Sequence, residues 1–542
     1  MRVLGSRLRR EERAETGLST VWVIGLFSTM AMAMAAGASW ATADTGGGNS
    51  SGGGTPIGSV RVTSPDDLLG APFVPGTRLV EDLAQAYVEE EYFVEGESTL
   101  FTYANNPPLG PTDITPVEEE VPYKTRLIVR RPESPQNFNG TVVVEWWNST
   151  AGFDTAPAWE PSAGYFARQG IIYVGVTNST TSLDYLVQGC RLLGILPPSC
   201  GSRYESLSMP ENGLAFEMMT QIAALLKSDQ ADNPIPAEYR VKRLFHVGES
   251  QQAGSLVTYA SAFHAPGVND GYFIQAGIRA RPINSGPACG AEDSPAFPDC
   301  TPRLAFPDSQ VRTDLPVPVY QLITQTDFEA LGFNVFGRQA DTPTYRYYEV
   351  AGGSHNTVHV GIELIPAGVF GPFPILLEDL CRNELNTTAD GPVFVSYVLN
   401  ALWERMEEQV RFGKAPPAGI VMDDADGVLS RDELGNVTGG VRLPSMEAPV
   451  ATYASANEAD PTLPPQLQGI GSLACRLSGS VFPLEGETLD ELYPRTRSYF
   501  REVFTSVRRL KRQGLILPRD GLSILLEALW NPVGGGRGTG AE

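Results

Sequence analysis

Apolar runs alternate with amphipathic segments through the middle of the chain. Segments 160–169, 214–227 and 251–264 have the apolar spacing of helices. The short apolar runs that predict strands are 141–147, 170–176, 244–247, 272–275, 317–323 and 344–349. Buried strands separated by helices are typical of a mainly parallel sheet that is covered by helices on both faces. The pattern therefore predicts an α/β fold.

The two ends of this region show other patterns. Residues 87–94, 99–103 and 123–130 alternate or are β-branched, which predicts an antiparallel start to the sheet. Residues 178–211 lack periodicity and are expected to form an insertion. The C-terminal extension, 380–542, is predicted to contain helices at 394–411, 497–512 and 520–530, with a largely irregular Pro/Gly-rich segment at 415–470. We expect 61–542 to form one domain with these additions.

Ser250 occupies the most informative position of the chain. The apolar run 244–247 leads into Gly248-Glu249-Ser250, and a helical pattern starts at Gln251. A serine on a sharp strand-to-helix turn exposes its hydroxyl above the helix N-terminus, as in the nucleophile elbow of α/β-hydrolases. Gly-x-Ser alone is a weak motif in a chain with 56 glycines, but the flanking pattern favours a nucleophile here.

Gln252 departs from this motif. A small residue is usual two places after the nucleophile, because the turn is tight there. A glutamine at that position must point outward, or the turn must be slightly opened.

A serine nucleophile needs a base, and the chain has only four histidines. The order nucleophile, acid, histidine of the elbow enzymes excludes His246, which precedes Ser250. His264 lies at the far end of the predicted helix, roughly 20 Å from Ser250 at about 1.5 Å per residue. His355 follows a predicted strand and a Gly-Gly turn, so it is our candidate base, with His359 in reserve.

Asp327 is the candidate acid, because it follows the strand 317–323 and precedes His355 by one further predicted strand. A carboxylate there could accept the imidazole N–H and fix its tautomer. Asp341 and Glu329 are alternatives, and an Asp after a strand is often only a helix cap. For the oxyanion hole we expect the backbone N–H of Gln251 and an amide near Asn148, in the loop that follows 141–147.

Two aromatic residues and one acidic motif have simpler interpretations. Trp146 and Trp147 could line an acyl pocket, although a tryptophan beside a sheet is usually core. Asp424-x-Asp426-Gly427 with Glu433 imitates a calcium loop, but Met422 stands at the first ligand position, which favours a turn. We expect no cofactor and no metal.

The formal net charge is −23, which argues against nucleic acid or an anionic membrane surface as a partner. Residues 1–43 begin with a basic segment, continue with an apolar stretch at 21–40 and end in Ala41-Thr42-Ala43. This predicts a secretory signal, followed by a flexible linker at 44–60. The apolar stretch is long, so an uncleaved anchor is the alternative. Either way we expect a secreted or periplasmic protein.

Six cysteines follow the predicted cleavage site, an even number in an oxidising compartment. The close pairs Cys190–Cys200 and Cys289–Cys300 each bracket a Pro-containing loop, which suggests two local bridges and a third bridge, Cys381–Cys475, although six cysteines allow 15 connectivities.

Several stretches together resemble a largely uncharacterised family of bacterial α/β-hydrolase-domain proteins. These stretches span most of residues 86–530 and are Tyr123-x-Thr125-Arg126, 139–146, Gly248-Glu249-Ser250-Gln251, 351–355 and 435–444. The resemblance implies an α/β-hydrolase fold and a mechanism with Ser250, an acid and His355, but no particular substrate.

We therefore expect a secreted hydrolase that cleaves carboxylic esters of small molecules or polymers through an acyl-enzyme. A peptidase or acyltransferase on the same fold is the nearest alternative. A non-catalytic binding protein on a hydrolase scaffold is the alternative from another class.

Overall fold

The computed structural model describes a large part of the chain. The described residues are 60–75, 87–105, 108–191, 199–284, 307–333, 335–356, 363–365, 375–386, 395–531 and 533. The predicted signal, all but the last residue of the predicted linker, and His359 lie outside these ranges.

A nine-stranded sheet forms the centre of the fold, in the order β1-β2-β3-β5-β4-β6-β7-β8-β9. Its strands are β1 (Arg61–Thr63), β2 (Tyr87–Tyr103), β3 (Ile114–Pro132), β4 (Thr141–Trp146), β5 (Ile172–Val176), β6 (Arg243–Glu249), β7 (Gly271–Gln275), β8 (Val319–Thr324) and β9 (Tyr345–Val350). The strands from β5 to β9 in this order are parallel, whereas β1, β2 and β3 are antiparallel to their neighbours. The predicted α/β fold is confirmed.

The antiparallel edge differs in detail from the prediction. The two strands predicted at 87–94 and 99–103 form one continuous strand, β2. The pairing of β2 with β3 shifts register between Ser98 and Phe101, and β2 continues through the segment that separated the two predicted strands.

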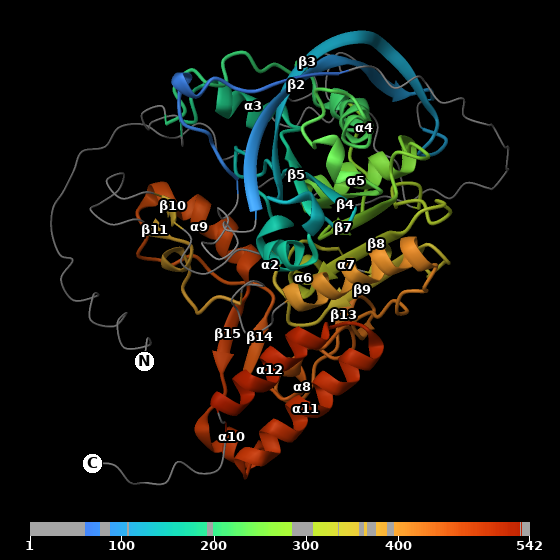
Figure 1. The fold of residues 1–542 in the computed structure, drawn as a ribbon. Coiled ribbons are helices and arrows are strands. Elements are labelled where there is room, and N and C mark those ends of the chain that lie inside the picture. The colour runs from blue at the N-terminus through green and yellow to red at the C-terminus, as the bar shows by residue number, and fades with distance from the viewer. Residues whose placement is uncertain are drawn as a thin grey trace.

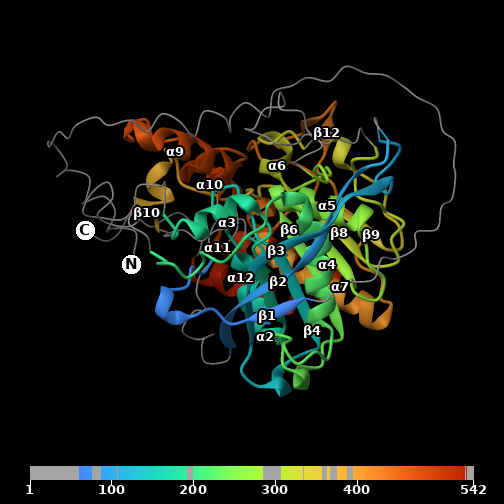
Figure 2. The same cartoon turned by 90° about the horizontal axis from the view of Figure 1, so that it is seen from above.

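Helices cover both faces of the sheet (Figures 1 and 2). They are α2 (Trp159–Gln169), α3 (Thr180–Val187), α4 (Ala215–Leu226), α5 (Gln251–Ala262), α6 (Gln325–Glu329) and α7 (Val395–Phe412). On one face Trp403 of α7 packs against Phe166 of α2 and Phe273 of β7. On the other face Phe216 of α4 packs against Trp146 of β4. The alternating apolar runs of the sequence are the two sides of this core.

The C-terminal extension is built from short elements. They are β10 (Glu363–Ile365), β11 (Ile375–Leu376), β12 (Asp424–Ala425), β13 (Val428–Leu429), β14 (Ala451–Ala454), β15 (Ser480–Pro483), α8 (Pro444–Glu447), α9 (Pro465–Ser478), α10 (Gly486–Leu492), α11 (Thr496–Gln513) and α12 (Pro518–Trp530). The disulfide Cys381–Cys475 joins two parts of this extension, and Cys190–Cys200 closes a loop after α3. Both bridges are among the three predicted, and the third, Cys289–Cys300, lies outside the described residues.

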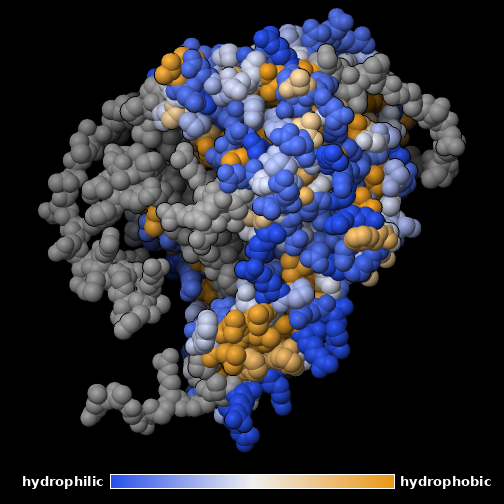
Figure 3. Space-filling model, viewed as in Figure 1, coloured by the Kyte–Doolittle hydropathy of each residue, from blue (hydrophilic) through white to orange (hydrophobic). Residues whose placement is uncertain are grey.

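Apolar side chains are exposed on the extension, where α11 and α12 lie together (Figure 3). Leu522, Leu529 and Trp530 of α12 are 57%, 55% and 77% exposed. The described helices include none that is both long and apolar enough to cross a bilayer.

Candidate active site

Ser250 stands alone between β6 and α5, with φ 54° and ψ −113°. A positive φ is strained for any residue with a side chain, and such strain is typical of functional turns. The turn is tight, because a Cβ on Gly248 would lie 2.4 Å from the carbonyl oxygen of Gln252. The side chain of Ser250 remains partly exposed at the carboxyl end of the parallel strands. This is the geometry of a nucleophile elbow.

Gln252 does not point outward, as one of the two expected alternatives required. Its side chain is 4% exposed, because position 252 lies on the face of α5 that packs against the sheet. The glycine at 248 lets the two backbone segments approach each other, so the turn accommodates a long side chain after the serine.

His355 lies in the turn that follows β9 and is 4% exposed. Its Nδ1 lies 2.5 Å from Oδ1 of Asp327, whose carboxyl group is completely buried. Gly352, with φ +74°, allows the chain to reverse after β9 and carry the imidazole toward the end of β8. The structure thus brings together the predicted base and the predicted acid.

The other carboxylate oxygen of Asp327 caps α6. Oδ2 accepts hydrogen bonds from the backbone N–H of Thr324 at 2.6 Å and from its hydroxyl at 2.9 Å. Asp327 is therefore both a helix cap and the partner of His355, two interpretations that the sequence analysis treated as alternatives. The alternative acids bind elsewhere: Asp341 accepts from Gly419 N, and Glu329 binds Arg431.

Glu249 contacts the opposite nitrogen of the same ring. Its Oε1 lies 3.1 Å from Nε2 of His355, and its Oε2 accepts a hydrogen bond from Nδ2 of Asn148, also at 3.1 Å. The carboxyl group is buried at the end of β6, directly before Ser250. Glu249 was not among the predicted site residues, although a carboxylate that ends an apolar strand must find a buried partner.

The two carboxylates change the proton affinity of the imidazole. Burial by itself lowers the pKa of His355, but Glu249 and Asp327 outweigh it and raise the pKa to about 9. Burial raises the pKa of Glu249, and the charge of His355 opposes that shift. Both carboxylates therefore favour the protonated form of the imidazole.

Ser250 and His355 are not hydrogen-bonded to each other in this conformation. The hydrogen bonds of the described residues give the Ser250 hydroxyl no partner, while Nε2 of His355 faces Glu249. Catalytic hydrogen bonds are often formed only when substrate binds, so this arrangement is compatible with a resting state.

The loop after β4 lies against the start of α5. Its backbone N–H groups are engaged: Asn148 N–H donates to Thr155 O at 3.1 Å, and Ser149 N–H donates to Oε1 of Gln251 at 3.3 Å. The backbone N–H of Asn148 thus has an acceptor within its own loop. That of Ser149 binds a side-chain oxygen of Gln251, which also accepts from the Ser149 hydroxyl at 2.9 Å. Gln251 is the first residue of α5, so its N–H has no acceptor inside the helix.

The remaining candidates are structural. His246 is buried between Trp146 Nε1 and Asn269 Oδ1, and burial lowers its pKa to about 4. His264 binds the hydroxyl of Tyr272. Trp146 and Trp147 are 1% and 0% exposed, so they are core residues.

The acidic motif near residue 424 forms a hairpin turn. Asp426 and Gly427 have φ 53° and 81° between β12 and β13. Asp424 pairs with Arg338. In the described ranges, no group of three or more His, Cys, Asp or Glu side chains is placed to hold a metal ion.

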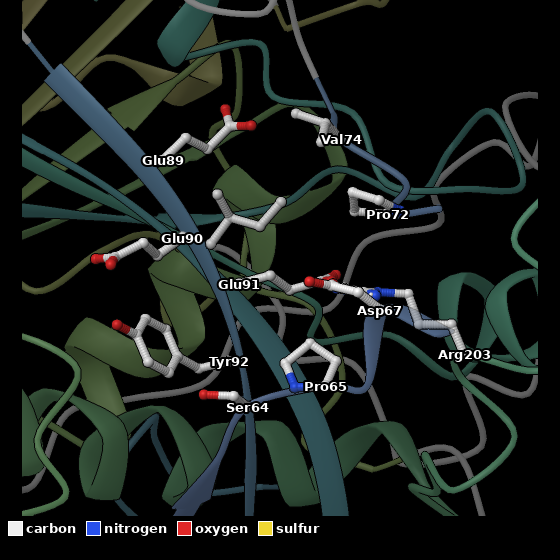
Figure 4. Close-up of a pocket in the computed structure, with 11 residues that line it drawn as sticks. Ser64, Pro65, Asp67, Pro72, Val74, Glu89, Glu90, Glu91, Tyr92 and Arg203 are labelled. Carbon is white, nitrogen blue, oxygen red and sulfur yellow. Dashed lines mark hydrogen bonds and ion pairs between the residues drawn. The ribbon is translucent and has the colours of Figure 1, made fainter. Parts of the chain in front are cut away.

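A pocket lies beside β1 and β2 (Figure 4). Its three glutamates are already paired with arginines: Glu89 with Arg130, Glu90 with Arg131 and Glu91 with Arg203. None of the candidate catalytic residues lines it. The candidate catalytic residues lie instead at the carboxyl ends of β6, β8 and β9.

Comparison with known proteins identifies the fold family. A model of the family described as alpha/beta hydrolase domain matches residues 56–525. No curated protein matches the chain. Similar solved structures include a glucuronoyl esterase from Solibacter usitatus, with 10% identity and a TM-score of 0.29 over 57% of this chain and 84% of that one. An esterase from Pyrococcus furiosus has 13% identity and a TM-score of 0.25 over 52% and 88% of the two chains.

Proposed function

The chain belongs to the alpha/beta hydrolase domain family, and from that premise we propose that it is a serine hydrolase that cleaves carboxylic esters. The observation that carries the proposal is the strained turn that presents Ser250, one residue from the carboxylate that touches His355. His355 in turn contacts Asp327. These contacts support the roles of nucleophile for Ser250, base for His355 and acid for Asp327.

In the first half of the reaction the hydroxyl oxygen of Ser250 attacks the ester carbonyl carbon. The proton on Nε2 of His355 first passes to solvent water as the contact with Glu249 opens, and the neutral Nε2 then accepts the hydroxyl proton of Ser250. Asp327 accepts the Nδ1–H and stabilises the imidazolium that forms. When the tetrahedral intermediate collapses, the C–O bond to the alcohol breaks and the alkoxide oxygen takes the proton from Nε2.

The oxyanion of the intermediate needs two backbone donors. Gln251 N–H supplies one, because it opens α5 and the helix dipole adds positive potential there. Ser149 N–H supplies the second when the side chain of Gln251 moves aside. The side-chain amide of Asn148 binds Glu249, and its backbone N–H binds Thr155. Asn148 therefore supports the site without supplying its backbone N–H to the oxyanion.

In the second half of the reaction water attacks the acyl-enzyme. His355 takes one proton from the water, and the ester bond to Ser250 breaks. The same proton returns to the serine oxygen, which restores the enzyme and releases the acid. We also propose that the protein works outside the cytoplasm, on the basis of the predicted signal and the two disulfides.

The proposal is tested with purified protein on short-chain p-nitrophenyl esters. Ser250→Ala should reduce kcat by at least about 10³-fold, because only the oxyanion hole and substrate binding remain. A fluorophosphonate probe should label the natural protein and spare the Ser250→Ala variant. Undiminished turnover in Ser250→Ala, with unchanged circular dichroism, would refute a serine mechanism. Amide substrates assayed in parallel separate an esterase from a peptidase.

A further inference from the structure

We propose that Glu249 is a positioning residue that holds His355 as a cation and away from Ser250 until the site is used. The inference rests on the proposed function, because it assigns to Glu249 a control over the base of that reaction. It follows from one juxtaposition: the two ring nitrogens of a single buried imidazole each face a carboxylate, and one of these adjoins the nucleophile.

The geometry places Glu249 in competition with Ser250 for one atom. Only Nε2 of His355 is available to a serine hydroxyl, because Nδ1 is occupied by Asp327 at 2.5 Å. Glu249 Oε1 lies 3.1 Å from that same Nε2. While this contact lasts, Nε2 carries a proton and donates it to the carboxylate. A protonated Nε2 cannot accept the proton of Ser250.

Glu249 is itself held in place. The amide nitrogen of Asn148 donates both to Oε2 and to the backbone carbonyl of Glu249, each at 3.1 Å. Asn148 Oδ1 accepts the N–H of Thr150, which fixes the amide orientation. The loop after β4 thus keeps the carboxylate directed at the imidazole.

The charged groups around this imidazole act in one direction. In the described part of the chain, the groups that face His355 are Glu249 from β6 and Asp327 from α6, and both favour the cation. Asp327 also repels the charge of Glu249, and Glu145 of β4 interacts with Glu249 in the same unfavourable sense. Removal of one acid should therefore make the imidazole easier to deprotonate.

The reaction needs neutral His355, so its activity rises as pH passes through the pKa of that residue. If Glu249 raises the pKa of His355, the acid limb of the kcat/KM profile should lie at high pH in the natural protein. An opposite charge within contact distance commonly moves a pKa by about 1–3 units. Glu249→Gln should therefore move the acid limb to lower pH by about that amount.

The experiment compares complete pH profiles of kcat/KM for the natural protein, Glu249→Gln and Glu249→Asp. Nitrophenol release is followed at its isosbestic wavelength, and spontaneous hydrolysis is subtracted. The shorter Asp moves the carboxylate back from Nε2, so its limb should lie between the other two. In parallel, the imidazole pKa of His355 is measured by nuclear magnetic resonance in Glu249→Gln and in the natural protein, where it should move with the kinetic limb.

Glu407→Gln is the matched control. Glu407 of α7 is 7% exposed and accepts a hydrogen bond from Asn139 in the loop before β4, so its replacement tests only the removal of a buried carboxylate. Its limb should not move.

The outcomes separate this inference from the proposed function. An active Ser250→Ala variant overturns the serine mechanism. An inactive Ser250→Ala variant, together with unmoved limbs in Glu249→Gln and Glu249→Asp, overturns only the role of Glu249. If Glu249→Gln does not fold, Glu249→Asp and the resonance of His355 in that variant decide the question alone.

Discussion

Two buried clusters of charge lie on the same sheet, and they differ in the nature of their cation. In the arginine cluster, Arg126 of β3 binds Glu91 at 2.9 Å, Asp154 at 3.0 Å and the hydroxyl of Thr177 at 3.1 Å. In the histidine cluster, His355 binds Asp327 and Glu249. Both cations are almost completely buried, and each contacts two carboxylates.

The comparison shows why one cluster is structural and the other chemical. Burial by itself lowers the pKa of Arg126, but Tyr204, Asp154 and Glu91 outweigh burial and raise that pKa. The guanidinium therefore keeps its proton. This guanidinium binds Glu91 of β2 and Asp154 of the loop after β4, and so joins this loop to the antiparallel edge of the sheet. An imidazole can lose its proton within an accessible pH range. A buried cation between two carboxylates therefore stabilises the fold at Arg126, whereas at His355 it controls the proton affinity of the candidate base.

Of the replacements that separate the two clusters, that of Asp327 should have the largest effect on activity. In Asp327→Asn the carboxylate that stabilises the imidazolium is lost, and kcat should fall by about 10⁴-fold on short acyl esters. An asparagine can still cap α6, so thermal melting should change little. Thr324→Ala is the comparison for stability, because it removes the hydroxyl that caps α6 and binds Asp327, at a cost of about 1 kcal/mol, while the carboxylate that contacts His355 remains. An Asp327→Asn variant with natural kcat would remove Asp327 from the mechanism.

Replacement of Arg126 should affect stability instead. Arg126→Met leaves Glu91 and Asp154 with fewer partners in the interior, which should lower the free energy of unfolding by about 3–5 kcal/mol. The matched control is Arg131→Met, because the Arg131–Glu90 pair is partly exposed and should cost less than about 1 kcal/mol. Urea unfolding measures both. Equal free energies of unfolding for Arg126→Met and Arg131→Met would show that the arginine cluster does not stabilise the fold.

The smallest effect is a pH dependence of stability. The folded pKa of His355, about 9, lies above its ordinary value of 6.5, so its proton stabilises the folded state below pH 6.5. That stabilisation is lost as the pH rises through about 9. The raised pKa of Glu249 acts in the same sense, because the folded state again holds the proton more tightly. Urea unfolding below pH 6.5 and above pH 9 should therefore show a fall that is smaller in His355→Gln. An equal fall in the variant would assign the dependence to other groups.

Local patterns were sufficient for the backbone of the site. The strand-to-helix change at residue 250 predicts the sharp turn, and the Gly-Gly turn before His355 predicts its place beyond a strand. The contact of His355 with Asp327 also agrees with the expected order of residues. Side-chain partners were harder to predict. The backbone N–H of Asn148 binds Thr155 because the loop folds back on itself. The burial of Gln252 depends on how α5 packs.

The sequence by itself determined the α/β alternation, the turn at Ser250 and the close pairing of Cys190 with Cys200, because each depends on residues that are near in the chain. The Cys381–Cys475 pairing, with a sequence separation of 94, was predicted only as the bridge that remained. Only the tertiary structure decided that the residue before Ser250 turns its carboxylate toward His355. The physical reason is that this contact joins β6 to the turn after β9, two segments separated along the chain. Its strength comes from burial, which only the folded core supplies.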